Sequence, residues 1–274
     1  MKAATAIGVV IAILSLIVGG IMKGTSPTQL INPAAFVIII PTVAGCTLAS
    51  VGMERFKLIP ALYKRAFSPP DLDLASSVTQ LTGFAEQARK DGLLALEEQI
   101  ESIEDPFTRK GMQLVVDGTD PELLIDILET DTHAMQARHK ANASSFTKAG
   151  QFSPTIGVMG TVVGLVHVLG NLSAPETLGP SIATAFIATL YGIATANLIF
   201  LPVGARLAAL TLEEVEARQL LLEGIVAIQA GDNPRIVQEK LLGYVAPAER
   251  EAIREGGGKP NLTAVDGGAA AQAA

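Results

Sequence analysis

The chain has few of the side chains that build catalytic, metal or disulfide sites. Its 274 residues include one cysteine, three histidines and no tryptophan. The single cysteine, Cys46, excludes a disulfide within the chain. His133, His139 and His167 are not spaced as metal ligands, and there is neither a P-loop nor a nucleophile elbow. We therefore predict that the protein is not an enzyme, holds no metal and needs no cofactor.

Positive charge is also in short supply. Lysine and arginine number 20 against 27 acidic residues, which gives a formal net charge of -7. Binding to a phosphate backbone requires a sustained basic stripe, and none is present. Nucleic acid is therefore not an expected partner.

Long apolar runs are abundant. Hydrophobic residues make up 49% of the chain and its mean hydropathy is +0.40. A helix of about 20 apolar residues crosses a bilayer. The runs of suitable length predict an all-α membrane protein with four transmembrane helices, in the lipid bilayer at 3–22, 34–53, 152–172 and 180–205. Residues 1–53 would form a first transmembrane hairpin and residues 151–205 a second.

The remaining segments have the patterns of soluble helices. Residues 54–150 are expected to form a helical insert between spans two and three, and residues 206–255 amphipathic helices that start at Arg206. Within the insert, Asp71 or Asp73 can cap a helix that ends at Gly92, a second helix is expected over about 93–103, and Asp120 is expected to cap the start of another. Residues 256–274 have too little bulk to bury and are expected to be disordered. Basic residues flank the spans on one side, which predicts that the insert, the C-terminal helices and both termini are cytoplasmic.

Small and hydroxyl residues recur at helical spacing in the second hairpin, among them Ser153, Gly157 and Gly164 in its first run and Ala185 and Gly192 in its second. Such stripes let helices approach closely within a membrane. If the spans begin near Phe152 and Pro180, Thr161 and Thr189 each lie roughly 14 Å into the hydrocarbon core. Each hydroxyl could bond to its own helix carbonyl four residues back, or both could supply oxygen ligands to a cation.

A cation path also needs negative charge. Glu176, in the connector, is the only charged residue of 151–205, and no carboxylate lies inside any predicted span. A cation crossing beside these helices would therefore need an acid from another protein.

Three blocks of the sequence resemble the MotA/PomA family, the A subunits of bacterial flagellar stators, within the wider MotA/TolQ/ExbB group. They are FSPTIGVMGTVVGLVHVLGNL (152–172), AFIATLYGIATANLIFLP (185–202) and LLEGIVAIQAGDNPRIVQEKLLGYV (221–245). The resemblance implies five A subunits around two single-span B subunits in the bacterial inner membrane, with a B-subunit aspartate carrying the ion. Ion flow would then turn the A ring against the rotor's switch protein.

The resemblance also assigns residues in the insert. The basic-to-acidic pattern of the family matches Arg89 with Lys90, then Glu97 with Glu98, and implies rotor contact. The alternative is a solvated helical surface, which describes most charge runs.

The family's two prolines at the cytoplasmic ends of spans three and four match Pro154 and Pro202, and imply hinges that couple ion release to the insert. Locally, Pro154 could be a first-turn proline and Pro202 a helix terminator.

The same resemblance places Thr189 at the family's span-four threonine and Thr161 where sodium-type members carry threonine. This favours sodium over protons as the transported cation. His167 is expected to be a packing or interface residue rather than a proton relay. Departures from the family pattern occur at Gln151, Asn32 and Ala194.

Two other functions remain open. One is an ExbB/TolQ-like, proton-driven energiser of another envelope machine, although that group has one span before its cytoplasmic region and this chain has two. The other is a self-contained cation channel, which would need its own intramembrane acid or filter.

Overall fold

The computed structural model describes residues 4–70, 72–170 and 175–254. Within these ranges the chain forms helices and no strand, and it divides into two compact units. Unit 1 comprises Met1–Pro70 and Met135–Leu212, and unit 2 comprises Asp71–Ala134 and Glu213–Ala274. The predicted disordered tail, 256–274, and the end of the third predicted span, 171–172, lie outside the described residues.

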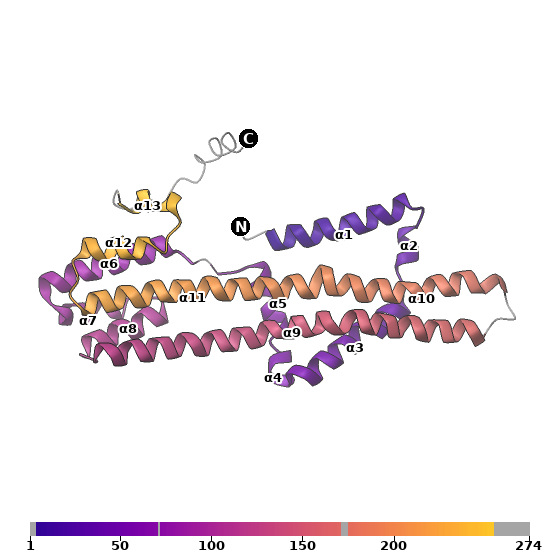
Figure 1. Ribbon diagram of the computed structural model, residues 1–274, viewed down its shortest axis with the longest axis horizontal. Helices are drawn as coiled ribbons and strands as arrows, with labels where there is room; N and C mark the ends of the chain where they lie inside the picture. The colour runs from indigo at the N-terminus through magenta and orange to yellow at the C-terminus, as the bar shows by residue number, and fades with distance from the viewer. Residues whose placement is uncertain (1–3, 71, 171–174, 255–274) are drawn as a thin grey trace. The chain divides into compact units, whose positions relative to one another are not determined.

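Unit 1 contains most of the apolar helices, and Figure 1 labels the elements of both units along the chain. Its elements are α1 (Ala4–Met22), α2 (Pro27–Leu30), α3 (Pro33–Val51), α4 (Met53–Phe56), α5 (Ile59–Phe67), the later part of α9 (Pro121–Gly170), α10 (Pro175–Thr195), the π-helical η2 (Ala196–Phe200) and the start of α11 (Leu201–Gln229).

Unit 2 is built from shorter helices around the other parts of α9 and α11. Its remaining elements are α6 (Leu74–Asp91), the 3-10 helix η1 (Leu93–Leu96), α7 (Glu97–Ile100), α8 (Pro106–Val116), α12 (Pro234–Leu242) and α13 (Pro247–Arg254).

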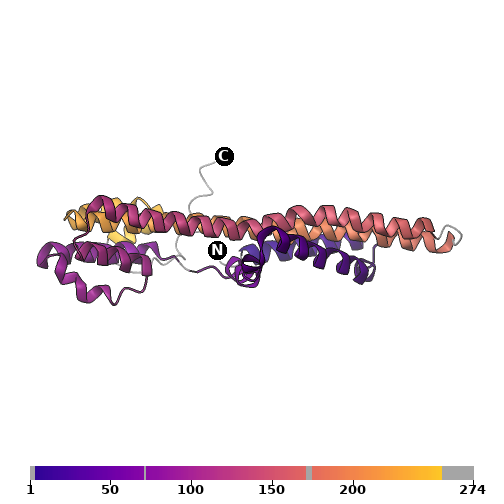
Figure 2. The ribbon, with the colours of Figure 1, turned by 90° about the horizontal axis from the view of Figure 1, so that it is seen from below.

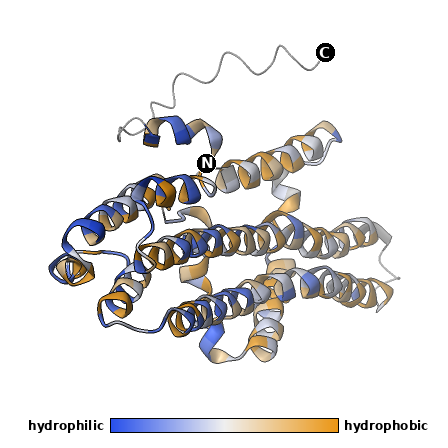
Figure 3. Cartoon of the chain, turned by 60° about the vertical axis from the view of Figure 1, so that its left-hand side comes forward, coloured by the Kyte–Doolittle hydropathy of each residue, from blue (hydrophilic) through white to orange (hydrophobic). Residues whose placement is uncertain are grey.

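Four helical stretches of the described chain are long and apolar enough to cross a membrane, namely Thr5–Met22, Pro33–Val51, Pro121–Gly170 and Leu178–Gln229. The predicted all-α fold with four apolar spans is therefore confirmed. Figure 3 shows the contrast in composition, since α1 is coloured mainly as hydrophobic and α13 mainly as hydrophilic.

Several helix ends follow local sequence signals. The Asp73 side chain accepts a hydrogen bond from the Ser76 amide (2.9 Å) and begins α6. Gly92 ends α6 as predicted, with a φ of 86° that disfavours any residue with a side chain. Asp120 caps the start of α9 by accepting from the Glu122 amide at 3.0 Å.

Other boundaries differ from the sequence prediction. The second span ends at Val51 rather than residue 53, because Gly52 turns the chain with a φ of 81°. The helix expected over 93–103 is η1 followed by α7 and ends at Ile100. Residues 101–105 leave the helix because Asp105 must be extended to precede Pro106 and cap α8.

The helix expected to start at Arg206 is not separate from the fourth span. From Pro175 the chain passes through α10, η2 and α11 without a turn, and Pro180 lies inside α10 rather than at its start. The span and the following helix are thus continuous in secondary structure, with a change of helical winding at η2.

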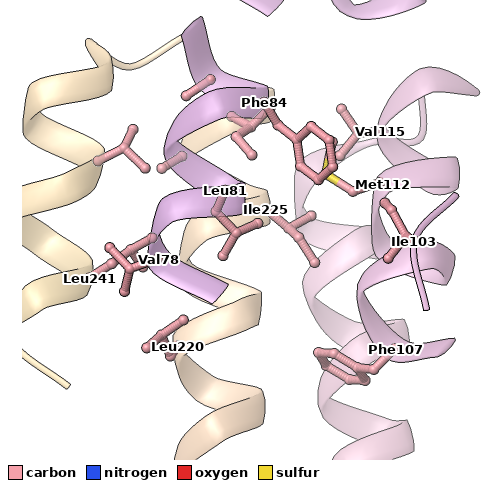
Figure 4. Packing of buried hydrophobic residues seen from close by; sticks show 14 of the residues in the cluster. Val78, Leu81, Phe84, Ile103, Phe107, Met112, Val115, Leu220, Ile225 and Leu241 are labelled. Atoms are coloured by element: carbon pink, nitrogen blue, oxygen red, sulfur yellow. The ribbon is translucent and has the colours of Figure 1, made fainter. Parts of the chain in front are cut away.

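Unit 2 has a core of large apolar side chains, shown in Figure 4. Leu81 of α6, Met112 of α8 and Ile225 of α11 are completely buried. Each such side chain contributes about 1.5–3 kcal/mol on burial. This core gives the insert and the C-terminal helices a common, water-excluding centre.

Unit 1 buries mainly small residues instead. The inward stripe of α3 recurs every fourth position, at Ala35, Ile39, Val43 and Thr47. Many large residues of α9 and α10 are exposed, among them Val166 and Phe186. In the isolated chain, these apolar surfaces face outward, as lipid-facing or subunit-facing surfaces do.

Candidate functional site

The backbones of α9 and α10 make close contact in unit 1, where the two helices run side by side (Figure 1 and Figure 2). A Cβ built on Gly192 would lie 2.6 Å from the Ser153 carbonyl oxygen and 2.8 Å from Gly157 Cα. A Cβ on Gly164 would lie 2.7 Å from the Ala185 Cβ. Residue numbers rise on one helix as they fall on the other, so the pair is antiparallel. The predicted small-residue stripes therefore bring the two backbones into direct contact.

Thr161 and Thr189 meet within this contact, and their hydroxyl groups are hydrogen-bonded to each other. The Thr161 hydroxyl also lies 3.2 Å from the Gly157 carbonyl oxygen and 3.1 Å from that of Ala185. The Thr189 hydroxyl lies 3.4 Å from the same Gly157 oxygen. The structure thus contains both geometries considered from the sequence, a backbone bond four residues back for Thr161 and a cluster of oxygens.

The cluster has more oxygens than protons to share. Two hydroxyls and two carbonyls contribute four oxygen atoms, whereas each hydroxyl carries a single proton. Oxygen atoms in this arrangement are the ligands that hard cations prefer. The cluster is chemically able to contact a partly dehydrated cation, although Thr161 is only 9% exposed in the single chain.

A second hydroxyl pair lies further along the same helix contact. Ser153 Oγ and Thr195 Oγ1 are 2.7 Å apart, and Thr195 Oγ1 donates to the Tyr191 carbonyl or to its Ser153 partner. Ser153 is completely buried. Sequence reasoning placed Ser153 in the small-residue stripe but missed Thr195. Thr195 could have been found by extending the antiparallel register of α9 and α10, because this register places Thr195 opposite Ser153.

The two predicted hinge prolines do not occupy the local positions expected of them. Pro154 lies in the interior of α9 rather than in a first turn, and Pro202 does not end a helix. Both local interpretations are therefore wrong.

The neighbouring structure explains how each proline is tolerated. Just before Pro202, the π-helical η2 lets the Leu201 amide bond to the Ala196 carbonyl, so the helix widens where proline supplies no donor. Pro154 leaves the Gly150 carbonyl without its usual donor. Gly150 in turn packs on Leu201, whose Cδ2 lies 2.6 Å from the position of a Cβ on Gly150. The two proline-containing segments are thus in direct contact.

Tyr191 connects the two hairpins of unit 1. Its hydroxyl donates to the Leu30 carbonyl at 2.7 Å and accepts from the Asn32 amide at 3.2 Å. Asn32, one of the departures from the family pattern, caps α3 by accepting from the Ala35 amide at 3.0 Å. This contact between residues far apart in the chain was not foreseen from the sequence, since one tyrosine in an apolar span gives no indication of its partner.

His167 lines an open groove of about 410 Å³ between α3, α9 and α10, together with Asn32, Pro180 and Thr184. Gln151 is exposed and Ala194 half-buried. The groove adjoins the threonine cluster, because Ala185, whose carbonyl oxygen belongs to the cluster, lines the groove, although neither Thr161 nor Thr189 does.

The four charged residues singled out in the insert are all exposed. Arg89 and Lys90 lie in the last turn of α6, and Glu97 and Glu98 lie in the first turn of α7. Each pair has the sign that stabilises the helix end on which it lies. Within the described residues, none of the four forms an ion pair. Their charges therefore remain available to a partner.

Comparison with known proteins gives a consistent result. A family model described as the MotA/TolQ/ExbB proton channel family matches residues 99–220. Motility protein A of Bacillus subtilis (strain 168) is 34% identical over 262 residues, which cover 95% of this chain and 97% of that protein. Motility protein A of Borreliella burgdorferi is 38% identical over 220 residues, which cover 80% of this chain and 84% of that protein. A chain of the flagellar MotAB stator complex from Bacillus subtilis superimposes with a TM-score of 0.85 at 35% identity. The superposition covers 90% of this chain and 97% of that chain.

Proposed function

The chain belongs to the MotA/TolQ/ExbB proton channel family and is a flagellar motor stator A subunit, and we propose how its residues serve that role. It is a multi-pass membrane protein. The distribution of basic residues around the spans supports an orientation with both termini in the cytoplasm, in a bacterial inner membrane.

The observation that carries the proposal is an oxygen cluster without an acid. Thr161, Thr189 and two carbonyl oxygens gather between α9 and α10. The described residues of the predicted spans 3–22, 34–53, 152–172 and 180–205 contain no aspartate or glutamate. A cation at this level needs a balancing charge. The name MotAB of the similar complexes supports a B subunit as the partner, and we propose that an acid of this B subunit supplies the charge.

The exposed large residues of unit 1 support self-association. Val162, Val166 and Leu169 lie on α9 at helical spacing and are 55–65% exposed. Such a surface suits contact with lipid, a B subunit or further copies of the chain. A ring of five A subunits around two B subunits would cover it.

We assign torque generation to the charged residues at the end of α6 and at the start of α7. Charges that engage and release a rotor repeatedly must be exposed, because exposed charges give fast, reversible contact. Arg89, Lys90, Glu97 and Glu98 meet this requirement. The two apolar helices before the insert, α1 and α3, distinguish the chain from the single-span layout expected of an ExbB/TolQ-like energiser.

Charge reversal tests this assignment. We expect Arg89→Glu or Glu97→Lys to impair swimming while the stator complex assembles normally, because surface charges contribute only about 0–1 kcal/mol to stability. Lys110→Glu is the matched control, since Lys110 is an exposed cation on α8 of the same unit. Normal swimming in both reversal variants would contradict a role in rotor contact.

The coupling ion is a separate proposal. The hydroxyl of Thr161 adds an oxygen ligand of the kind sodium prefers, so we propose sodium as the driving ion. Swimming speed should rise with sodium concentration at fixed pH, and Thr161→Ala should weaken that dependence. A speed insensitive to sodium in both proteins would favour protons instead.

A further inference from the structure

Leu94 is an exposed apolar side chain placed between the two charge pairs. It is 72% exposed, more than the other large apolar side chains described in unit 2, such as Ile236 (59%) and Leu123 (52%). It lies in η1, which follows Arg89 and Lys90 and precedes Glu97 and Glu98. A single exposed leucine is ordinary by itself. Its position at the centre of a proposed contact surface is what distinguishes it.

The turn that carries Leu94 is held firmly by its neighbours. Leu96 of the same turn is completely buried and Ile100 is 3% exposed. Gln87 Nε2 of α6 donates to the Ala95 carbonyl at 3.3 Å. Gly92, with a φ of 86°, sets the direction in which η1 leaves α6. Leu94 therefore projects from an ordered turn and needs little further ordering when it binds.

We propose that Leu94 is the apolar anchor of the rotor-contact surface, and that it enters an apolar pocket on a protein partner. The proposal rests on the proposed rotor contact by Arg89 and Glu97. The pocket is expected to carry acidic groups on the side that meets Arg89 and Lys90, and basic groups on the side that meets Glu97 and Glu98. A leucine flanked by opposite charges thus fixes both the position and the orientation of the partner.

The charges and the leucine contribute differently to binding. Exposed charges mainly speed association and are screened by salt, with a Debye length of about 8 Å at physiological ionic strength. Burial of an apolar side chain at the centre of an interface mainly slows dissociation, and salt does not screen it. The two contributions can therefore be measured separately.

The test uses the complete stator complex, A with B subunits, and purified rotor switch protein as the probe. Association and dissociation rates are measured at about 0.05 and 0.5 M salt, concentrations below and above physiological ionic strength, so that charges are weakly screened in one case and strongly screened in the other. The variants are Leu94→Ser, the conservative Leu94→Met, the exposed control Leu123→Ser, and Arg89→Glu.

We expect Leu94→Ser to raise the dissociation rate roughly 10- to 100-fold at both salt concentrations, as the loss of most of one buried leucine implies. Leu94→Met should remain within about threefold of the wild type, because it keeps the apolar bulk. Leu123→Ser should have little effect. Arg89→Glu should lower the association rate at low salt and much less at high salt.

Each contrary result has a distinct meaning. A dissociation rate that Leu94→Ser leaves unchanged, or raises only at low salt, would overturn the role of Leu94 as an anchor. In that case a lowered association rate of Arg89→Glu would still support rotor contact. No effect of either Leu94→Ser or Arg89→Glu would overturn the rotor role itself. Reduced assembly of Leu94→Ser with normal binding per assembled complex would show that the leucine packs against another copy of the chain, which also overturns the proposal.

Discussion

The two units of this chain differ in the residues that form their helix contacts. In unit 1 the closest contact joins backbones, with Gly157 facing Gly192, while large side chains such as Phe186 point outward. In unit 2, large side chains such as Leu81 and Met112 are completely buried. Small residues thus make the close backbone contacts of unit 1, which also buries large side chains such as Phe146, whereas the core of unit 2 consists mainly of large apolar side chains.

The difference follows from the surroundings of each unit. Water drives large apolar side chains into a core, and the gain is roughly 25 cal/mol for each Å² buried. Lipid is as apolar as leucine and provides no such drive, so helices associate by close packing and by hydrogen bonds. The contact between α9 and α10 in unit 1 therefore depends on glycine and hydroxyl groups, and the core of unit 2 depends on leucine and isoleucine.

The largest expected effect is in the core of unit 2. Leu81→Ala should cost about 2–5 kcal/mol of stability, because it leaves a cavity between α6 and α11. Leu123→Ala, on an exposed part of the same unit, should change stability by less than about 0.5 kcal/mol. Thermal unfolding of the purified complex measures both. Equal losses would show that burial does not govern the stability of unit 2.

In unit 1, adding one methyl group at a helix contact should be harmful. Gly192→Ala places a carbon 2.6 Å from the Ser153 carbonyl oxygen, and separating the helices should cost about 1–3 kcal/mol. Gly45→Ala on α3 is the matched control, because its added carbon has no neighbour within 4 Å.

Both glycine substitutions gain the same helix propensity, so their difference isolates the helix contact. The yield of assembled complex and its thermal stability in mild detergent are the measurements. If Gly192→Ala assembled as well as Gly45→Ala, close backbone packing would not be what joins α9 to α10.

A smaller effect is expected from the hydroxyl of Tyr191. Tyr191→Phe removes the hydrogen bonds to Leu30 and Asn32 and should cost about 1 kcal/mol. Tyr63→Phe is the control, because the Tyr63 ring packs edge-on against Phe146 and the described structure contains no hydrogen bond to its hydroxyl. Faster amide exchange near residues 30–32 in Tyr191→Phe alone would support the contact, whereas equal exchange in both variants would not.

The smallest effect is expected at the surface of unit 2. Lys240 of α12 pairs with Glu223 of α11, and the hydrogen bond that the Lys240 ammonium donates to the Glu223 carboxylate raises the pKa of Lys240. A raised lysine pKa stabilises the fold at neutral pH, and this contribution is lost only as the pH rises past about 10.4.

Because Lys240 is exposed and Glu223 is only partly buried, Lys240→Gln should cost less than about 1 kcal/mol, and less still in high salt. Unfolding at pH 7 and at pH 11 is the measurement. A loss of stability well above about 1 kcal/mol that persists in high salt would mean that the ion pair contributes more than an ordinary surface contact.

Much of the local structure was predictable because its causes are local. Asp73 and Asp120 cap helices, and Gly92 ends one, since each signal depends on the residue and its immediate neighbours. The four apolar spans were predictable for the same reason, because length and hydropathy can be read one segment at a time.

The prolines show where local reasoning failed. A proline in isolation predicts a first turn or a helix end, yet Pro154 and Pro202 both lie within continuous helices. The missing amide at Pro202 is tolerated through the π-helical turn before it, and that turn packs on Gly150 of the opposite helix. The cause of the exception is thus a neighbour distant in the chain.

The amino-acid sequence alone determined the number of spans, the absence of an acid within them and the charges of the insert, because these depend on the transfer free energy and charge of each residue. Only the tertiary structure decided that Thr161 meets Thr189, that Ser153 meets Thr195 and that Tyr191 holds the link before α3. Such pairings depend on the register and rotation of helices against one another, to which every residue of the contact contributes.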